Sequence, residues 1–185
     1  MVVRLESNQY PIKAPRSGLH CRGLVNRAIN ILGVMGIVNK MTPIRILLVE
    51  DDPADQKLVR MSLSNQEINS ELCVVNNAEE ALDFLCSQGG DSSQTTTPDL
   101  ILLDLNMPGM GGKEFLKHIK VDEDLRQIPV VIVTTSNSER DVIDSYKLQA
   151  AGYVHKPKTL DEFRRVMGEI KDYWFMLCKL PNKEY

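Results

Sequence analysis

The sequence predicts an α/β fold, a doubly wound parallel sheet of five strands with helices on both faces. Two observations carry this prediction. Short apolar runs alternate five times along the chain with amphipathic segments of helical length. The apolar runs are rich in Val, Ile and Leu and lack the polar alternation of a half-exposed strand, which is typical of parallel strands buried on both faces.

The first half of the predicted domain contains two strands and two helices. The run "IRILLVE" (44–50) reads as a buried strand that ends in acids. A helix over 53–64 opens with a proline, which the first turn of a helix favours. A second strand is expected over 71–75, and a helix over 77–87 opens with an asparagine cap followed by acids in its first turn.

The second half continues the alternation after a polar loop over 88–98, which ends at a proline. Each remaining strand is a short Val/Ile/Leu-rich or Tyr/Val-containing run, and each remaining helix carries spaced apolar positions. The expected elements are strands over 100–104, 128–136 and 152–155, and helices over 111–120, 139–149 and 161–178.

A chain of 185 residues has room for one medium domain and an appendage. Residues 1–40 hold six Lys/Arg and one acid, whereas the remainder carries a net charge of −8. Met41 opens "MTPIRILLVEDD", which is a natural beginning for the domain. We therefore expect a disordered extension over 1–40, or the product of an upstream start codon, then a domain over 41–180 and a tail over 181–185.

Charge and hydropathy argue against two classes of partner. The acidic main body would be repelled by nucleic-acid phosphates. The most apolar stretch of the extension, "AINILGVMGIV" (28–38), is too short to span a hydrocarbon core about 30 Å thick. An Arg-rich, acid-poor segment also fits a transit peptide or a membrane-surface helix, but a plain extension is favoured. The four scattered cysteines lack C-x-x-C spacing and indicate free thiols in a reducing cytoplasm.

Polar side chains gather where the predicted strands end. Glu50 and Asp51 close the first strand, and Asp104 closes the very apolar third strand. Thr134 lies at the end of the fourth strand and Lys156 directly after the fifth. Ligands of doubly wound sheets bind outside the carboxyl ends of the strands, so we expect these five residues to form one site.

This set of groups suits phosphoryl transfer. Clustered carboxylates repel one another, and Mg²⁺ relieves that repulsion because it prefers oxygen ligands. With Mg²⁺ on Asp51 and Asp104, one oxygen of Asp104 remains free to attack phosphorus. Lys156 and Thr134 would then stabilise the charge of the transferred group.

Four motifs carry a resemblance to a known family. The segments "ILLVEDDP", "LILLDLNMPGMGG", "VVIVTTS" and "GYVHKP" resemble, in type, order and spacing, the motifs of the response-regulator receiver domains of two-component signalling. The resemblance covers residues 44–180. It implies a flavodoxin-like receiver fold with strand order 2-1-3-4-5, and a phosphoacceptor switch that dephosphorylates itself rather than an enzyme. Lys158 departs from the family, which commonly has an aromatic residue there.

The resemblance also implies a role for individual residues. A sensor histidine kinase would donate the phosphoryl group, and Mg²⁺ would be the cofactor. The implied assignments are Glu50 and Asp51 as the acidic pair, Asp104 as phosphoacceptor, the Asn106 carbonyl as a further Mg²⁺ ligand, Thr134 as switch hydroxyl, Lys156 as phosphate-binding lysine, Tyr153 as switch aromatic, and Asn106 and Ser136 as residues controlling the hydrolytic water.

Several alternatives stay open at this point. Thr135 could replace Thr134 as the working hydroxyl, because strand ends are uncertain by a residue or two. Tyr153 could be plain packing, Asp52 is expected to be a solvated acid of the first helical turn, and His155 to be a solvated residue.

Two other functions compete with the phosphorylation switch. A haloacid-dehalogenase type of hydrolase needs a second aspartate two residues after the nucleophile, where this chain has Asn106. A flavodoxin-type FMN site needs a Gly- and hydroxyl-rich loop after the first strand, and the acidic "VEDDPADQ" would repel the phosphate.

The last helix suggests how the signal leaves the domain. Residues beyond it are too few for an output domain, so we expect protein partners or self-association. A less specific second resemblance, to single-domain receivers that serve cyanobacterial phytochrome kinases, rests on "EIKDYWFML".

We expect a homodimer through the last helix and its neighbouring strand, with kinase docking as the competing use. The expected core stripe is Leu160, Phe163, Met167, Ile170, Trp174 and Leu177, and the surplus apolar surface is Val166, Tyr173, Phe175 and Met176.

Overall fold

The computed structural model describes residues 43–64, 69–86 and 97–181. The expectations for the extension over 1–40, for most of the loop over 88–98 and for the end of the tail concern residues outside these ranges.

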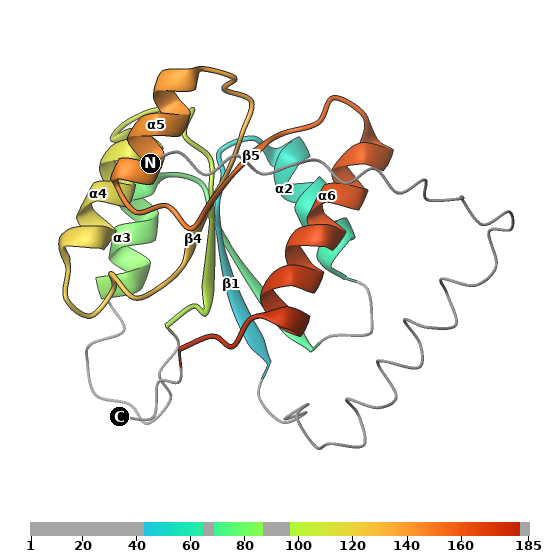
Figure 1. The fold of residues 1–185 in the computed structure, drawn as a ribbon, viewed down its shortest axis with the longest axis horizontal. Coiled ribbons are helices and arrows are strands. Elements are labelled where there is room, and N and C mark those ends of the chain that lie inside the picture. Colours follow the sequence, from blue (N-terminus) through green and yellow to red (C-terminus); the bar gives the residue numbers. More distant parts are fainter. Residues whose placement is uncertain (1–42, 65–68, 87–96, 182–185) are drawn as a thin grey trace, which may run out of the picture. The chain divides into compact units, whose positions relative to one another are not determined.

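Five parallel strands form one sheet in the order β2-β1-β3-β4-β5, which confirms the predicted fold and strand order (Figure 1). The strands are β1 (Ile44–Val49), β2 (Ser70–Val75), β3 (Leu100–Leu103), β4 (Val130–Thr134) and β5 (Gly152–His155). Because β1 and β3 are neighbours, with Val49 paired to Leu103, the residues that follow them emerge side by side. Thr134 of β4 pairs with His155 of β5 in the same way.

The helices cover both faces of the sheet. They are α2 (Pro53–Leu63), α3 (Ala78–Cys86), α4 (Gly111–Val121), α5 (Glu139–Lys147) and α6 (Leu160–Asp172), which continues into a π-helical turn, η2 (Tyr173–Leu177). Helices α3, α4 and α5 lie on one face, and α2 and α6 lie on the other (Figure 1). Among the described residues, no helix is long and apolar enough to cross a membrane.

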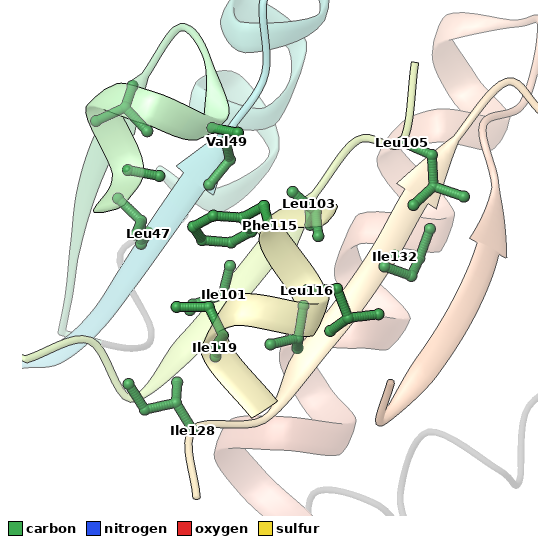
Figure 2. Packing of buried hydrophobic residues seen from close by; sticks show 14 of the residues in the cluster. Leu47, Val49, Ile101, Leu103, Leu105, Phe115, Leu116, Ile119, Ile128 and Ile132 are labelled. Atoms are coloured by element: carbon green, nitrogen blue, oxygen red, sulfur yellow. The ribbon is translucent and has the colours of Figure 1, made fainter. Parts of the chain in front are cut away.

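The sheet is apolar on both faces, as its sequence predicts. Leu47 and Val49 of β1 belong to the core beneath α3 and α4, whereas Ile46 and Leu48 belong to the core beneath α2 and α6. Strands β3 and β4 alternate in the same manner, and all of their residues are buried. Phe115 of α4 lies against β1 and β3 at the centre of the first core (Figure 2).

Some element bounds differ from the sequence prediction for local reasons. The fourth strand was expected over 128–136, but β4 begins at Val130, after Pro129, which has no N–H to donate to a ladder. Helix α5 ends at Lys147, two residues before the expected end, because Gln149 adopts a left-handed backbone with φ of 63°. Asn77 caps α3 as predicted, its side chain accepting a hydrogen bond from the Glu80 N–H at 2.8 Å.

The prediction of a core stripe along the last helix is wrong at two residues. Phe163, Met167 and Ile170 are buried and Trp174 packs against them, but Leu160 is 43% and Leu177 78% exposed.

Leu177 is exposed because the last helix ends in the π-helical turn η2. A hydrogen bond from Cys178 N to the Tyr173 carbonyl, five residues earlier, closes this turn. This wider turn rotates the following side chains relative to an α-helix. Phe175, expected on the surface, therefore packs against the core, whereas Tyr173 and Met176 are exposed as expected. Val166, in α6 before this turn, was also expected on the surface but packs against the core.

The central position of Phe115 generates a stability prediction. Phe115→Ala removes a fully buried ring between α4 and the sheet, so we expect the free energy of unfolding to fall by about 3–5 kcal/mol. Val121→Ala, at the exposed end of the same helix, should change it by less than about 0.5 kcal/mol. Urea unfolding measures both, and equal effects would contradict the packing described.

Candidate functional site

The strand ends bring the predicted residues together at one edge of the sheet. Backbone hydrogen bonds continue the ladder just beyond the strands: Asp104 N donates to the Val49 carbonyl at 3.0 Å, and Lys156 N donates to the Thr134 carbonyl at 2.7 Å. These bonds fix where the Asp104 and Lys156 side chains begin. The site therefore depends on the parallel register of β1, β3, β4 and β5.

The centre of the site is the ammonium group of Lys156. Its Nζ lies 2.6 Å from Glu50 Oε2, 2.9 Å from Asp104 Oδ2 and 2.7 Å from Asp55 Oδ2. The side chains of Lys156, Glu50 and Asp104 are at most 6% exposed, and that of Asp55 is 25% exposed. A buried charge is stable only when it is paired, and here one cation is paired with three carboxylates.

The surroundings shift the pKa values of these groups. Burial raises the pKa of Glu50 to about 7, although Lys156 opposes the shift. Burial alone would also raise the pKa of Asp104, but hydrogen bonds from Thr134 and Lys156 and the charge of Lys156 outweigh it, so this pKa lies below its usual range. Burial would lower the pKa of Lys156, yet its hydrogen bonds to Asp55, Glu50 and Asp104 raise it, which keeps the ammonium charged.

Three carboxylates could hold a metal ion. Glu50, Asp51 and Asp104 each offer one oxygen, and these oxygens lie within 4.8 Å of one another. An all-carboxylate oxygen set is what hard divalent cations prefer. The donors therefore fit a divalent cation, beside the ammonium of Lys156.

A polar cluster surrounds Asp104 on the β4 side. The Asn106 N–H donates to Asp104 Oδ1 at 3.1 Å, and its side-chain amide lies 3.4 Å from Thr134 Oγ1 and 3.3 Å from Thr135 Oγ1. Thr134 is fully buried and hydrogen-bonds to Asp104, whereas Thr135 is exposed. Between the two candidate hydroxyls, the geometry favours Thr134.

The loop after β4 ties this cluster to Tyr153. Ser136 N donates to Thr134 Oγ1 at 3.3 Å, and the Tyr153 hydroxyl donates to the Ser136 carbonyl at 3.1 Å. The Ser136 hydroxyl donates to Asp141, whose carboxylate lies 2.7 Å from Lys113 Nζ on α4. Tyr153 is therefore hydrogen-bonded as well as packed.

Three charged residues near the site are not predicted from the sequence. Asp55 contacts Lys156, and Asp141 and Lys113 hold the Ser136 loop. Asp55 had a readable signal, since it is an acid of the first turn of α2, shortly after the acidic end of β1. Nothing in the sequence pairs Lys113 with Asp141, because their contact depends on how α4 and α5 pack.

Asp52 and His155 are sequence neighbours of site residues but make no contact with the Lys156 ammonium among the described ion pairs. Asp52 was expected to be an acid of the first turn, but it is the N-cap of α2 and accepts hydrogen bonds from Ala54 N at 2.7 Å and Asp55 N at 3.4 Å. It contributes to the helix start and not to the contacts of Lys156. His155 is exposed at the end of β5, as expected.

The loop after Asp104 is held close to the site. Gly109 has φ of +83°, which favours glycine, and the next residue, Met110, donates its N–H to Glu79 of α3 at 2.9 Å. Gly112, in the first turn of α4, approaches so closely that a Cβ there would lie 2.1 Å from the Asp104 carbonyl oxygen. The backbone around Asp104 is thus fixed from both sides.

The fold and the strand-end cluster define a class of protein. Residues 46–167 match the family described as the response regulator receiver domain, and the chain belongs to this family. This result supports the switch over the hydrolase alternative, for which nothing in the comparisons argues.

Individual relatives refine the class. The chain is 41% identical over 136 residues to the response regulator Rcp1 of Synechocystis sp., covering 74% of this chain and 92% of Rcp1. The Mn²⁺-bound crystal structure of Rcp1 superposes with a TM-score of 0.70, covering 76% of this chain and 100% of that one. The phosphorylated cyanobacterial phytochrome response regulator RcpA is 37% identical with a TM-score of 0.71, over 76% of this chain and 100% of RcpA. The predicted resemblance to cyanobacterial phytochrome response regulators is confirmed.

The close approach of Gly112 can be tested by adding one methyl group. Gly112→Ala should lower the free energy of unfolding by about 3 kcal/mol, because the added Cβ collides with backbone that cannot move aside easily. Gly168→Ala is the control: no atom lies within 4 Å of its Cβ position in α6, so the substitution should stabilise by about 0.5–1 kcal/mol. Thermal or urea unfolding measures the change in the free energy of unfolding for both variants. Stabilisation by Gly112→Ala would refute the close approach of Gly112 to the Asp104 carbonyl.

Proposed function

We propose that the protein is phosphorylated on Asp104 by a sensor histidine kinase, with Mg²⁺ as cofactor, and that it signals to protein partners through a conformational change. The observation that carries the proposal is the buried contact between Asp104 and Lys156, 2.9 Å apart and beside two further carboxylates that fit a divalent cation. The family and the similarity to Rcp1 and RcpA support it.

The reaction requires one nucleophilic oxygen and stabilisation of charge. An Asp104 carboxylate oxygen forms a bond to phosphorus while the bond from phosphorus to the donor histidine nitrogen breaks, and that nitrogen keeps the electron pair. Asp104 is well suited to attack because its low pKa keeps it ionised. Lys156 neutralises charge on the transferred group, and the Thr134 hydroxyl can donate to one of its oxygens.

Mg²⁺ would be held by Glu50, Asp51, Asp104 and the Asn106 carbonyl, with Glu50 acting directly or through a bound water. When bound, the cation would neutralise the carboxylates and the incoming phosphoryl charge. The Mn²⁺ in the Rcp1 structure supports a divalent ion in this family. Asn106 and Ser136, two residues after Asp104 and Thr134, would set how easily water reaches the phosphoryl group.

The switch would pass from Thr134 to Tyr153. The Thr134 hydroxyl accepts from Ser136 N, and the Ser136 carbonyl accepts from Tyr153. A Thr134 hydroxyl that turns to a phosphoryl oxygen weakens this link and releases Tyr153. Because Tyr153 lies on β5, the change would reach the surface formed by β5 and α6.

The input would be a kinase of the phytochrome type, in line with the similarity to RcpA. We expect the protein to act in the cytoplasm, without nucleic-acid or membrane partners, since its main body is acidic. It would act as a switch that loses its own phosphoryl group by hydrolysis, without a separate substrate.

A homodimer through α6, η2 and β5 would be the output surface. A groove of about 480 Å³ runs between them, lined by Tyr153 and His155 on the β5 side and by Val166, Tyr173 and Trp174 on the helical side. Strand β5 is the edge of the described sheet, and edge strands tend to pair with other chains. Leu177, 78% exposed beside this groove's η2 wall, adds apolar area.

Asp104→Asn tests the acceptor. The substitution removes the nucleophile and keeps the shape, so intact-mass measurement with acetyl phosphate and Mg²⁺ should show one phosphoryl group on the wild-type protein and none on the variant. Asp51→Asn should still be modified but should need a higher Mg²⁺ concentration for the same extent. Equal modification of the Asp104→Asn protein would refute the assignment.

The dimer is tested by sedimentation velocity at micromolar concentration. Tyr173→Ala with Leu177→Ala should shift a dimer to monomer, because both side chains are exposed and leave the core intact. Tyr146→Ala on α5 is a matched control, since Tyr146 is as exposed as Tyr173, each at 53%. A wild-type protein that is monomeric with and without phosphorylation would end the proposal.

A further inference from the structure

Asp55 has a place in the site that no role so far explains. It lies in the first turn of α2, where Pro53 opens the helix and Asp52 caps it. The cap bonds from Ala54 N and Asp55 N fix this turn. As a result, the Asp55 carboxylate reaches across 101 residues of sequence to Lys156 Nζ at 2.7 Å.

The hydrogen bonds of Lys156 leave no donor for a phosphoryl oxygen. An ammonium group has three N–H donors. Glu50, Asp55 and Asp104 each accept one of them, from three different elements of the fold. A phosphoryl group on Asp104 can bind Lys156 only by replacing an acceptor, either the Asp104 oxygen itself or, where that oxygen keeps its bond, Glu50 or Asp55.

Of the two acceptors other than Asp104, Asp55 is released more easily. Its side chain is 25% exposed, whereas the Glu50 side chain is 2% exposed. A carboxylate at the solvent side can regain water when it gives up its partner, but a buried one cannot. The exchange is therefore expected at Asp55.

The charge of Asp55 acts in opposite directions on the two ligands of the site. Glu50, Asp55 and Asp104 share a single ammonium group, and Asp51 lies beside Glu50 and Asp104, so a divalent cation at this site is attracted by the carboxylates. An anionic phosphoryl group is repelled by the same charge. Loss of the Asp55 charge should therefore weaken the binding of the cation and strengthen the binding of the anionic phosphoryl group.

We propose that Asp55 is a positioning residue that competes with the phosphoryl group for Lys156: it holds the ammonium in the unphosphorylated protein and shortens the life of the phosphorylated one. This inference rests on the proposed phosphorylation of Asp104. It makes α2 a determinant of how long the signal lasts.

The test compares two binding constants in Asp55→Asn and wild-type protein. Calorimetry gives the affinity for Mg²⁺ alone and, at saturating Mg²⁺, the affinity for beryllofluoride, an anion that adds to a carboxylate as a phosphoryl mimic. We expect Mg²⁺ to bind about fivefold more weakly to the variant and beryllofluoride about fivefold more tightly, with dephosphorylation slower by a similar factor.

Asp52→Asn is the matched control. It removes a carboxylate from the same turn, and asparagine caps helices as well as aspartate does. Asp52 makes no contact with Lys156 among the described hydrogen bonds and ion pairs. In about 0.3 M salt, which screens exposed charges, both constants should change less than about twofold in this variant. Asp55→Glu keeps the charge and should retain the wild-type Mg²⁺ affinity.

The outcomes separate the two proposals. If wild-type protein binds no beryllofluoride with Mg²⁺, the proposed function fails. If wild-type protein binds it but Asp55→Asn binds beryllofluoride equally or more weakly, Asp55 does not compete for Lys156. A general structural defect would weaken the binding of both ligands together, and circular dichroism of Asp55→Asn and Asp55→Glu detects such a defect independently.

Discussion

The site depends on one buried cation, the ammonium group of Lys156. Three carboxylates surround it within 2.9 Å, and two of their side chains are almost fully buried. Without the ammonium, Glu50 and Asp104 would be like charges with little water to solvate them. The ion cluster thus keeps the Asp104 carboxylate charged in a site with little water, which is the condition that the proposed phosphoryl transfer to Asp104 requires.

The parallel sheet makes this cluster possible. Lys156 and Glu50 are 106 residues apart in sequence, yet strand order β2-β1-β3-β4-β5 brings the ends of β1, β3, β4 and β5 to one edge. The strands themselves are apolar on both faces, so the polar groups collect where the strands stop. The same order sets Thr134 beside Asp104 and Tyr153 one strand further out, which links the site to the β5 edge.

Much of this arrangement was predictable from the sequence because parallel strands place their carboxyl ends together. Glu50, Asp51, Asp104, Thr134 and Lys156 could be named as one cluster from strand ends alone. What could not be predicted depends on side-chain reach between elements: the contact of Asp55 with Lys156 and of Lys113 with Asp141. The π-helical turn after α6 was also not predictable from the periodic pattern, and because of it Phe175 rather than Leu177 packs against the core.

The most direct measurement of the central claim is chemical identification of the phosphorylated residue. Borohydride reduces the acyl phosphate of an aspartate to the alcohol of homoserine, and peptide sequencing by mass spectrometry then locates it. After phosphorylation with Mg²⁺ and acetyl phosphate or a phosphorylated kinase, the account predicts homoserine at position 104. A reduced residue at Asp51 or Asp55 instead, or phosphate that resists reduction and maps to His155, would contradict it.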